Sequence, residues 1–331
     1  MAEYREIQGA AVQSLASSTG TIEGQIWYDN VNGAFKLEAA TTSATWATGT
    51  SLPAGREQAG QAGTQTAAIL AGGQPPSVYN TNTSFTYDGS SWTSTPNLGT
   101  ERRAANMFGI QTAAVLAASN QNNPRTYLTA TEEWNGSSWS SGGDINTARS
   151  KPYAGGTQTQ GVIAGGSGPT YSSATEEYNG TSWTTVTNMP ADQGNGTSGA
   201  DSQLDMSCVG GGPGNQTTHT IYNGTTWTAG NSLTGDGRRG NGGAMPSSSS
   251  PGFTAGGESA TVNPITVTEE YDGTSFSSST ALPTARRDFA SSDGGTGAAG
   301  ILSGGSNSPG ISNGVFEWTG PGVPETRTIT T

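Results

Sequence analysis

The sequence has very few of the residues that most often carry chemistry. Its 331 residues include one histidine, His219, and one cysteine, Cys208. A single cysteine excludes an internal disulfide framework, and one histidine with one cysteine cannot form the usual zinc site. The sequence also contains no Gly-x-Ser-x-Gly elbow, phosphate loop or acidic calcium loop. We therefore expect no catalytic, cofactor-binding or metal-binding residues, and predict that the protein is not an enzyme.

Charge and long apolar runs are also scarce. Only 11% of the residues are charged, the net charge is −12, and the 13 Lys and Arg are scattered along the chain. A nucleic-acid surface needs clustered basic residues, so we expect no nucleic-acid partner. No run approaches the roughly 20 apolar residues of a membrane span. The first residues have no apolar core of a secretory signal, and a helical apolar period is almost missing throughout.

A repeated turn organises the rest of the chain. An aromatic–Asx/Thr–Gly group occurs six times, and successive copies lie 44 to 49 residues apart. The groups are Tyr87-Asp88-Gly89, Trp134-Asn135-Gly136, Tyr178-Asn179-Gly180, Tyr222-Asn223-Gly224, Tyr271-Asp272-Gly273 and Trp318-Thr319-Gly320. In the first five, a second aromatic residue follows five positions after the first, at Trp92, Trp139, Trp183, Trp227 and Phe276. Asn-Gly or Asp-Gly between β-prone runs indicates a hairpin, and a strand-built repeat of this length predicts a propeller.

Each repeat can be divided into four strands. A connection that often ends in Leu-Pro-x-x-Arg leads into an inner strand, and a second, apolar strand ends in a Gly pair such as Gly72-Gly73. In the second repeat we place Ala117-Ala118 at the Gly pair. A loop of variable length follows, then a third strand such as Thr175-Glu176-Glu177-Tyr178, the Asn-Gly turn and a fourth strand with Trp.

This combination of a Gly doublet with a spaced Tyr and Trp resembles the kelch repeat, whose copies fold as four-stranded propeller blades. The resemblance covers residues 45–320 and implies an all-β, six-bladed propeller at residues 44–320. Departures from the pattern are Phe276 in place of Trp and Asp192-Gln193 where other repeats carry Arg.

The two ends of the repeat region complement each other. Trp46 has no Tyr-Asx-Gly group before it, and Trp318-Thr319-Gly320 has no Trp after it. We predict that Thr45–Ala47 is the outer strand of the blade whose three inner strands come from about residues 287–318. This pairing would remove an open sheet edge and close the ring.

Residues 1–43 lie outside the repeat. We predict a short helix near Ala10–Ala16 and a hairpin within Gly24–Leu37, and we leave 321–331 as a C-terminal tail. A lone hairpin is marginal in water. We therefore interpret 1–43 as a docking segment that uses Trp27, Tyr28 and Phe35.

Two polar sets recur in phase with the repeat. Arginines open the inner strands of five blades, at Arg56, Arg102, Arg149, Arg238 and Arg286, three of them followed by a second Arg. They either bridge blades or form a basic ring at the channel mouth that binds an acidic glycan or a protein. Strand direction places them on the face of the variable loops, opposite a face of uniform turns. For the glutamate pairs Glu132-Glu133, Glu176-Glu177 and Glu269-Glu270 we expect a solvated or inter-blade role, for His219 a plain strand position and for Cys208 an inert buried thiol.

The N-terminal string Gly24–Lys36 and the near-uniform repeats are similar to structural proteins of marine tailed bacteriophages. That resemblance implies a virion protein, namely a tail fibre, spike or capsid decoration, assembled in the bacterial host cytoplasm. It would dock to other virion proteins through residues 1–43, form a homo-oligomer on the particle, and present the propeller outward for attachment to a host-surface glycan or protein. The alternatives are an extracellular lectin-like adhesin and a carbohydrate-active enzyme.

Overall fold

The chain divides into two compact units in the computed structural model. One unit is the propeller at 45–319, and the other combines 1–44 with 320–331. The structure describes residues 13–15, 26–40, 43–121, 125–291, 295–307, 310–322 and 324–328, and these residues form strands and turns without a helix. Within these residues there is accordingly no helix long and apolar enough to cross a membrane.

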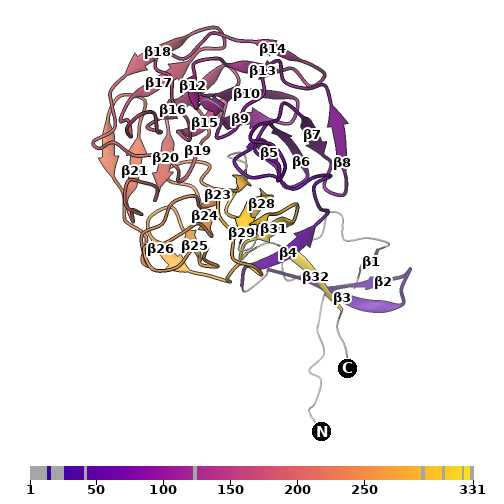
Figure 1. Ribbon diagram of the computed structural model, residues 1–331. Coiled ribbons are helices and arrows are strands. Elements are labelled where there is room, and N and C mark those ends of the chain that lie inside the picture. Colours follow the sequence, from indigo (N-terminus) through magenta and orange to yellow (C-terminus); the bar gives the residue numbers. More distant parts are fainter. Residues whose placement is uncertain are drawn as a thin grey trace. The chain divides into compact units, whose positions relative to one another are not determined.

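The propeller consists of six four-stranded antiparallel sheets arranged in a ring (Figure 1). Blade 1 contains β5 (Gly60–Thr64), β6 (Ala67–Ala71), β7 (Ser84–Tyr87) and β8 (Trp92–Thr95). Blade 2 contains β9 (Asn106–Ile110), β10 (Ala113–Ala117), β13 (Glu132–Trp134) and β14 (Trp139–Ser141). Blade 3 contains β15 (Tyr153–Thr157), β16 (Gln160–Ala164), β17 (Thr175–Tyr178) and β18 (Trp183–Val186).

The second half of the ring repeats this order. Blade 4 contains β19 (Thr197–Ala200), β20 (Met206–Val209), β21 (His219–Tyr222) and β22 (Trp227–Ala229). Blade 5 contains β23 (Gly242–Ala244), β24 (Gly252–Ala255), β25 (Thr268–Tyr271) and β26 (Phe276–Ser278). Blade 6 contains β27 (Ala290–Ser291), β28 (Ala299–Ser303), β31 (Val315–Thr319) and β4 (Thr45–Gly49). The predicted fold class, an all-β six-bladed propeller, is confirmed.

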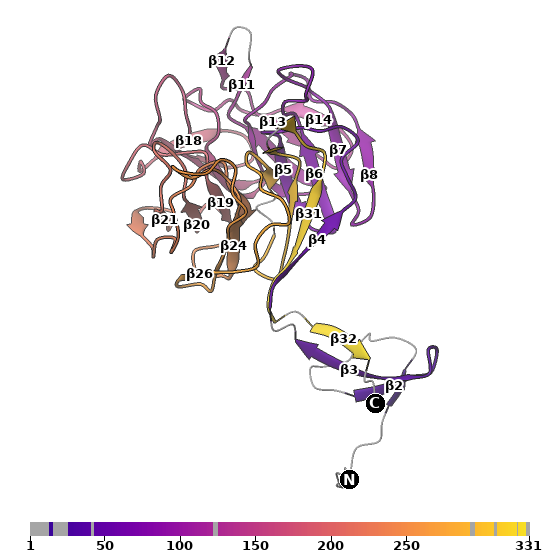
Figure 2. The same cartoon turned by 60° about the horizontal axis from the view of Figure 1, so that its bottom comes forward.

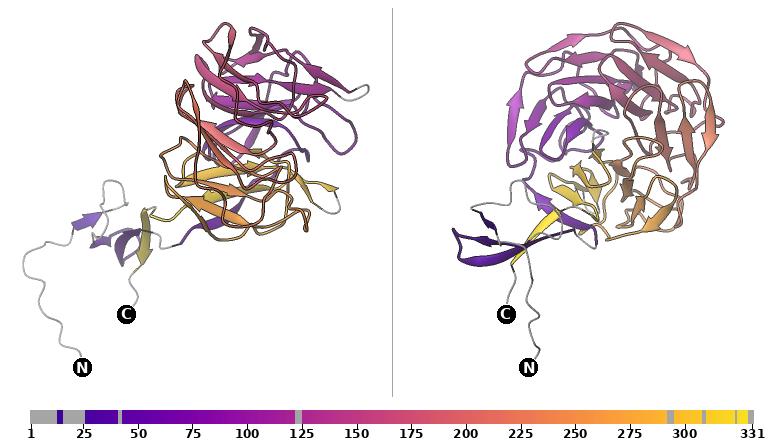
Figure 3. Two further views of the ribbon diagram at one scale, coloured as in Figure 1. Left: turned by 90° about the vertical axis from the view of Figure 1, so that its left-hand side faces the viewer. Right: turned by 180° about the vertical axis from the view of Figure 1, so that it is seen from behind.

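Blade 6 closes the ring in the predicted way. Strand β4 pairs antiparallel with β31, and Trp46 stands directly opposite Trp318. The two indole rings lie 4.9 Å apart between centroids. Successive inner strands contact one another around the whole circuit, from β5 through β27 and back to β5, as the view from behind makes visible (Figure 3). No blade of the ring is therefore left with an unpaired third strand.

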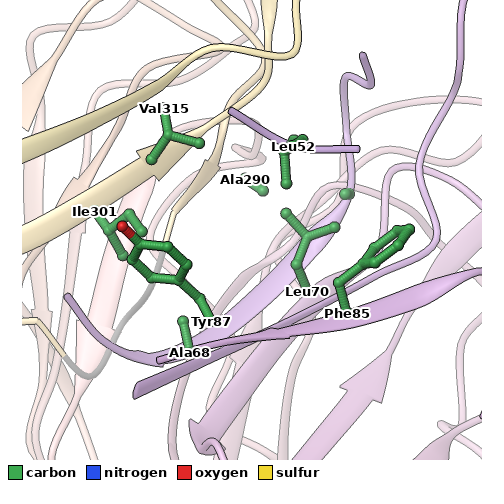
Figure 4. Close-up of a cluster of buried hydrophobic side chains, with 9 residues drawn as sticks. Leu52, Ala68, Leu70, Phe85, Tyr87, Ala290, Ile301 and Val315 are labelled. Carbon is green, nitrogen blue, oxygen red and sulfur yellow. The ribbon is translucent and has the colours of Figure 1, made fainter. Parts of the chain in front are cut away.

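Apolar side chains fill the spaces between neighbouring blades. Between blades 6 and 1, Leu70 and Tyr87 face Ile301 and Val315 (Figure 4). The blades approach closely where a strand carries glycine: a Cβ added at Gly161 would lie 2.2 Å from the ring of Phe108 in the preceding blade. Small residues in the strands thus make room for the aromatic residues of the adjacent sheet.

The Asx-Gly turns between third and fourth strands have the predicted chemistry. In blade 1, the Asp88 carboxylate accepts hydrogen bonds from the backbone N–H groups of Ser90 and Ser91, at 2.8 and 2.7 Å. Gly89 has a φ of 90°, a conformation that favours glycine. The same Asx bonds recur in blades 2 to 5. The turn is missing in blade 6 because its third and fourth strands come from opposite ends of the propeller.

Our placement of the second repeat's Gly doublet at Ala117-Ala118 is wrong by one residue. Ala117 is the last residue of β10, as Ala71 is of β6, so the doublet position falls on Ala118 and Ser119. Ala118 has a φ of 53°, close to the 68° of Gly72. The backbone conformation is therefore retained although the glycine is not.

Two additional hairpins arise in the loops after the second strands of blades 2 and 6. They are formed by β11 (Ser119–Gln121) with β12 (Thr126–Leu128), and by β29 (Ser306–Asn307) with β30 (Gly310–Ile311). Figure 2 shows β11 and β12 standing away from the ring.

The smaller unit is a four-stranded sheet with the order β1-β2-β3-β32. Its strands are β1 (Gln13–Leu15), β2 (Ile26–Asp29), β3 (Ala34–Ala40) and β32 (Pro324–Thr328). The predicted hairpin is β2 with β3, whereas Gln13–Leu15 is a strand rather than part of a helix, and the rest of Ala10–Ala16 lies outside the described residues. The segment that we left as a tail contributes β32, which pairs with β3.

We predict that removal of β4 destabilises the propeller much more than removal of the smaller unit. A chain of residues 50–319 lacks the β4–β31 ladder and the Trp46 indole, and should lose about 3 kcal/mol or more of unfolding free energy relative to a chain of residues 45–319. Denaturant unfolding followed by tryptophan fluorescence would measure the difference. Equal midpoints for the two chains would contradict the closure argument.

Candidate binding face of the propeller

The five arginines that we proposed as a binding face lie at the entry to their inner strands, but their side chains are buried. Arg102, Arg149 and Arg238 are 0% exposed. Each forms an ion pair with the first glutamate of the third strand in the blade that it enters: Arg102 with Glu132 at 2.6 Å, Arg149 with Glu176 at 2.6 Å, and Arg238 with Glu269. The guanidinium groups are thus directed into the blade rather than into the channel mouth.

The remaining blades vary the partner of this arginine. Arg56 stacks over Phe85 with its Cζ 4.8 Å from the ring centroid, and Arg286 stacks over Phe316 at 4.4 Å. In each case the phenylalanine occupies the strand position that a glutamate holds in blades 2, 3 and 5. Burial lowers the pKa of Arg56 to about 10. A cation–π contact therefore replaces the ion pair where no carboxylate is present.

Blade 4 has neither charge. Gln193 takes the place of the arginine, and its amide donates to the Thr218 hydroxyl at 2.6 Å. Thr220 takes the place of the glutamate. The residue at the arginine position and the residue at the glutamate position thus change together around the ring. We therefore interpret the five arginines as structural residues that external ligands do not reach. Our alternative interpretation, in which these five side chains form a basic ring at the channel mouth, is therefore wrong.

The glutamate directly before the third-strand aromatic residue has an inter-blade role in blades 2, 3 and 6. Glu133 accepts a hydrogen bond from the Tyr178 hydroxyl of the next blade, and Glu177 accepts one from Tyr222 at 2.8 Å. Glu317 of blade 6 accepts the equivalent bond from Tyr87 of blade 1 at 2.6 Å. These bonds repeat across three blade boundaries, and they confirm the inter-blade interpretation.

A closed circuit of backbone hydrogen bonds surrounds the channel on the arginine side. Each blade contributes one residue to it, two positions after the entry arginine or, in blade 4, after Gln193. The N–H of this residue donates to the carbonyl of the corresponding residue in the preceding blade, at 2.7–2.9 Å. We call these six residues the inner ring: Gln58, Ala104, Lys151, Asn195, Gly240 and Asp288. All six have φ between 51° and 65°. Sequence reasoning missed this ring because only one member is glycine.

Two members of the inner ring join across the channel. Lys151 of blade 3 and Asp288 of blade 6 belong to opposite blades, and Lys151 Nζ lies 2.8 Å from Asp288 Oδ1. The positive charge of Lys151 lowers the pKa of Asp288 although burial opposes that shift. The ion pair therefore spans the channel at the level of the inner ring.

The cations that reach solvent follow the buried arginines by one residue. Arg103, Arg239 and Arg287 are half-buried and lie at equivalent positions of blades 2, 5 and 6. Arg239 and Arg287 both bind the carboxylate of Glu258. Beside Arg287, an open groove of about 390 Å³ is lined by Glu57, Asn307 and Pro264, among others. This channel-mouth surface, rather than the five buried arginines, carries the accessible charge.

His219 and Cys208 occupy structural positions. The His219 ring packs edge-on against Tyr271 and Phe276 of the next blade, and its Nε2 lies 2.7 Å from the Ser207 hydroxyl. Cys208 is buried, and burial raises the pKa of its thiol. Among the described residues, no group of three or more His, Cys, Asp or Glu could hold a metal ion.

The proposed docking residues lie in the smaller unit. Tyr28 and Phe35 stand opposite each other on β2 and β3, with ring centroids 5.3 Å apart, and are 38% and 47% exposed. Trp27 points to the other face of the sheet and is buried. The Asp29 carboxylate fixes the intervening turn through the N–H groups of Val31 and Asn32, and these bonds together with the Asn32 side chain lower its pKa.

Comparison with known proteins shows the fold alone. No family model and no curated protein matches the chain. A solved structure titled "Structure of YjhT" has a TM-score of 0.65 and 12% sequence identity, and the match covers 81% of this chain and 96% of that chain. The propeller architecture is therefore shared, whereas the side chains of the channel mouth must be interpreted from this chain itself.

We predict that Arg149→Gln destabilises the protein by about 3 to 5 kcal/mol, because Glu176 would remain buried without its cation. The double variant Arg149→Gln/Glu176→Thr removes both buried charges and installs the residue types that blade 4 carries at these two positions, Gln193 and Thr220, so it should recover most of that loss. Chemical denaturation of both variants would measure this. A double variant as unstable as the single one would show that the ion pair is not the source of the effect.

A pH effect is expected from His219. Burial lowers the pKa of His219 to about 4, below the ordinary value of 6.5. The unfolded chain therefore binds a proton at higher pH than the folded chain, so the contribution to stability is complete above pH 6.5 and is lost as pH falls toward 4. The loss amounts to about 3 kcal/mol.

The control for this effect is His219→Thr, because threonine stands at the same strand position in blades 3 and 5, as Thr175 and Thr268. The difference in unfolding free energy between the original protein and this variant should change between pH 6.5 and 4. A difference that stays constant over that interval would refute the assignment.

Proposed function

We propose that the protein is a structural component of a tailed-phage virion, carried on the particle by its smaller unit and presenting the propeller for attachment to a host surface. The resemblance of Gly24–Lys36 and of the repeats to phage structural proteins motivates this proposal. Within the structure, the supporting observation is the division into two compact units, of which the smaller one exposes an apolar cross-strand pair.

The smaller unit has the features of an anchoring module. Ile26, Tyr28 and Phe35 are 42%, 38% and 47% exposed, and the first two alternate with the buried Trp27 along β2. Exposed aromatic residues on a rigid sheet are the type of side chain that dominates protein–protein contacts. Both ends of the propeller lead into this unit, so a protein bound there would hold the propeller by two connections.

The propeller has the features of a recognition scaffold. Its buried arginines, glutamates and histidine are all committed to packing and hydrogen bonding within the ring. Sequence variation is concentrated in loops at the arginine side, and loops on a rigid scaffold commonly carry recognition. A non-catalytic attachment role is consistent with this distribution.

We predict that the protein is found in purified particles of the phage whose genome encodes it, and that Tyr28→Ser/Phe35→Ser lowers its incorporation about tenfold or more, since loss of exposed aromatic anchors removes most of the energy of such contacts. Quantitative mass spectrometry of gradient-purified particles would measure incorporation. Val31→Ser, at a 69% exposed turn position of the same unit, is the matched control.

Particles that lack the original protein would contradict the virion assignment and favour the adhesin or enzyme alternatives. Normal incorporation of the double variant would contradict docking through this face. Immunogold labelling of the particles would then distinguish a head location from a tail location.

A further inference from the structure

The hairpin β11–β12 is one of the two hairpins in the loops after the second strands, and it is the one whose described residues include an arginine. Its first residue is Ser119, which follows Ala118. Ser119 stands at the position where the five other blades retain the second glycine of the doublet. The hairpin carries Asn120 and Tyr127 directly opposite each other, and Arg125 immediately precedes its returning strand. The loss of the glycine at this position therefore coincides with an added polar element on the variable face.

These residues form a continuous row with Arg103. The backbones of Arg103 and Asn120 exchange two hydrogen bonds of 3.0 Å, and Arg103 Nε lies 3.3 Å from Asn120 Oδ1. Across the hairpin from Asn120, the Tyr127 ring lies under the Arg125 guanidinium, with Cζ 5.2 Å from the centroid. Arg103 is half-buried, and Arg125 is exposed. Two guanidinium groups and a phenol ring thus lie on this hairpin and on the segment beside it.

The two arginines of this row have no ion-pair partner among the described residues. Within the described residues, neither Arg103 nor Arg125 forms an ion pair, whereas Arg239, Arg287 and Lys151 on the same face all do. Burial lowers the pKa of Arg103, Glu57 and Asp288 oppose that shift, and the nearby charge of Arg125 adds to it. Asp288 is already paired with Lys151. Like charges held close together disfavour each other, and a bound anion would relieve the repulsion between Arg103 and Arg125.

We infer that Arg103, Arg125 and Tyr127 form a binding site for the anionic group, carboxylate or phosphate, of a surface saccharide. Guanidinium groups bind both kinds of oxyanion in bidentate geometry, and the Tyr127 ring provides a flat surface. The buried Asn120 side chain positions Arg103 by accepting a hydrogen bond from its Nε. Tyr79, which is 58% exposed and close enough to affect the pKa of Arg103, extends this surface. The inference rests on the proposed attachment role and specifies the ligand class for it.

The test is titration calorimetry of the purified full-length chain with three probes: an oligogalacturonate, mannose 6-phosphate and a neutral galactose oligomer. The expected result is binding of at least one anionic probe, with affinity that falls as salt is raised, and no binding of the neutral oligomer. Arg125→Gln, at an exposed position, should weaken binding about tenfold or more, and Arg103→Gln/Arg125→Gln should abolish it.

Arg239→Gln is the matched control, because it removes the same charge from the same face at a residue that Glu258 already occupies. It should leave the affinity nearly unchanged. The inference is overturned if neither anionic probe binds, if the neutral oligomer binds equally well, or if Arg239→Gln and Arg125→Gln have the same effect. This assay uses the isolated protein, so its failure is distinguishable from a failure of the particle-incorporation experiment.

Discussion

Six backbone hydrogen bonds in a closed circuit determine how the blades of this protein fit together. Each inner-ring residue donates to its neighbour in the preceding blade, and the last bond returns to the first blade, from Gln58 N–H to the Asp288 carbonyl. Such a circuit closes only when the six blades together complete a full turn. It also requires positive φ at five residues other than glycine, at a conformational cost that the surrounding packing must offset. The antiparallel pairing of β4 with β31 secures the same closure at the outer edge.

The features that follow from repetition were predictable from the sequence, and those that depend on a single blade were not. The turn at Asp88-Gly89, the four-strand order and the Trp46–Trp318 pairing each follow from aligned copies of one unit. The inner ring left no residue signature, because Gln58, Ala104 and Lys151 share a backbone conformation rather than a side-chain type. The Lys151–Asp288 pair joins residues 137 positions apart, and only the ring geometry brings them together.

The burial of the entry arginines could have been inferred from the sequence with one further comparison. Arginine occurs with glutamate or phenylalanine at the second position of the third strand, as in Arg149 with Glu176 and Arg56 with Phe85, and glutamine occurs with threonine in blade 4. Coupled changes of this kind indicate contact within the fold. The second arginine, which directly follows the entry arginine as Arg103 follows Arg102, shows no such coupled change with a third-strand residue. This second arginine is the one that reaches solvent.

Both faces of the propeller hold the blades together, but only on the face of uniform turns do residues of the loops themselves make the inter-blade bonds. On the face of uniform turns, the Gln111 and Gln158 amides donate to backbone carbonyls of the preceding blade, at 2.7 Å to Tyr87 and 3.0 Å to Trp134. Substitution or insertion in these turns would break inter-blade bonds. On the opposite face, the inner ring and the entry arginines lie beneath the loops, so a loop can lengthen without disturbing the closure. The hairpin β11–β12 is such an extension, and it carries the exposed Arg125.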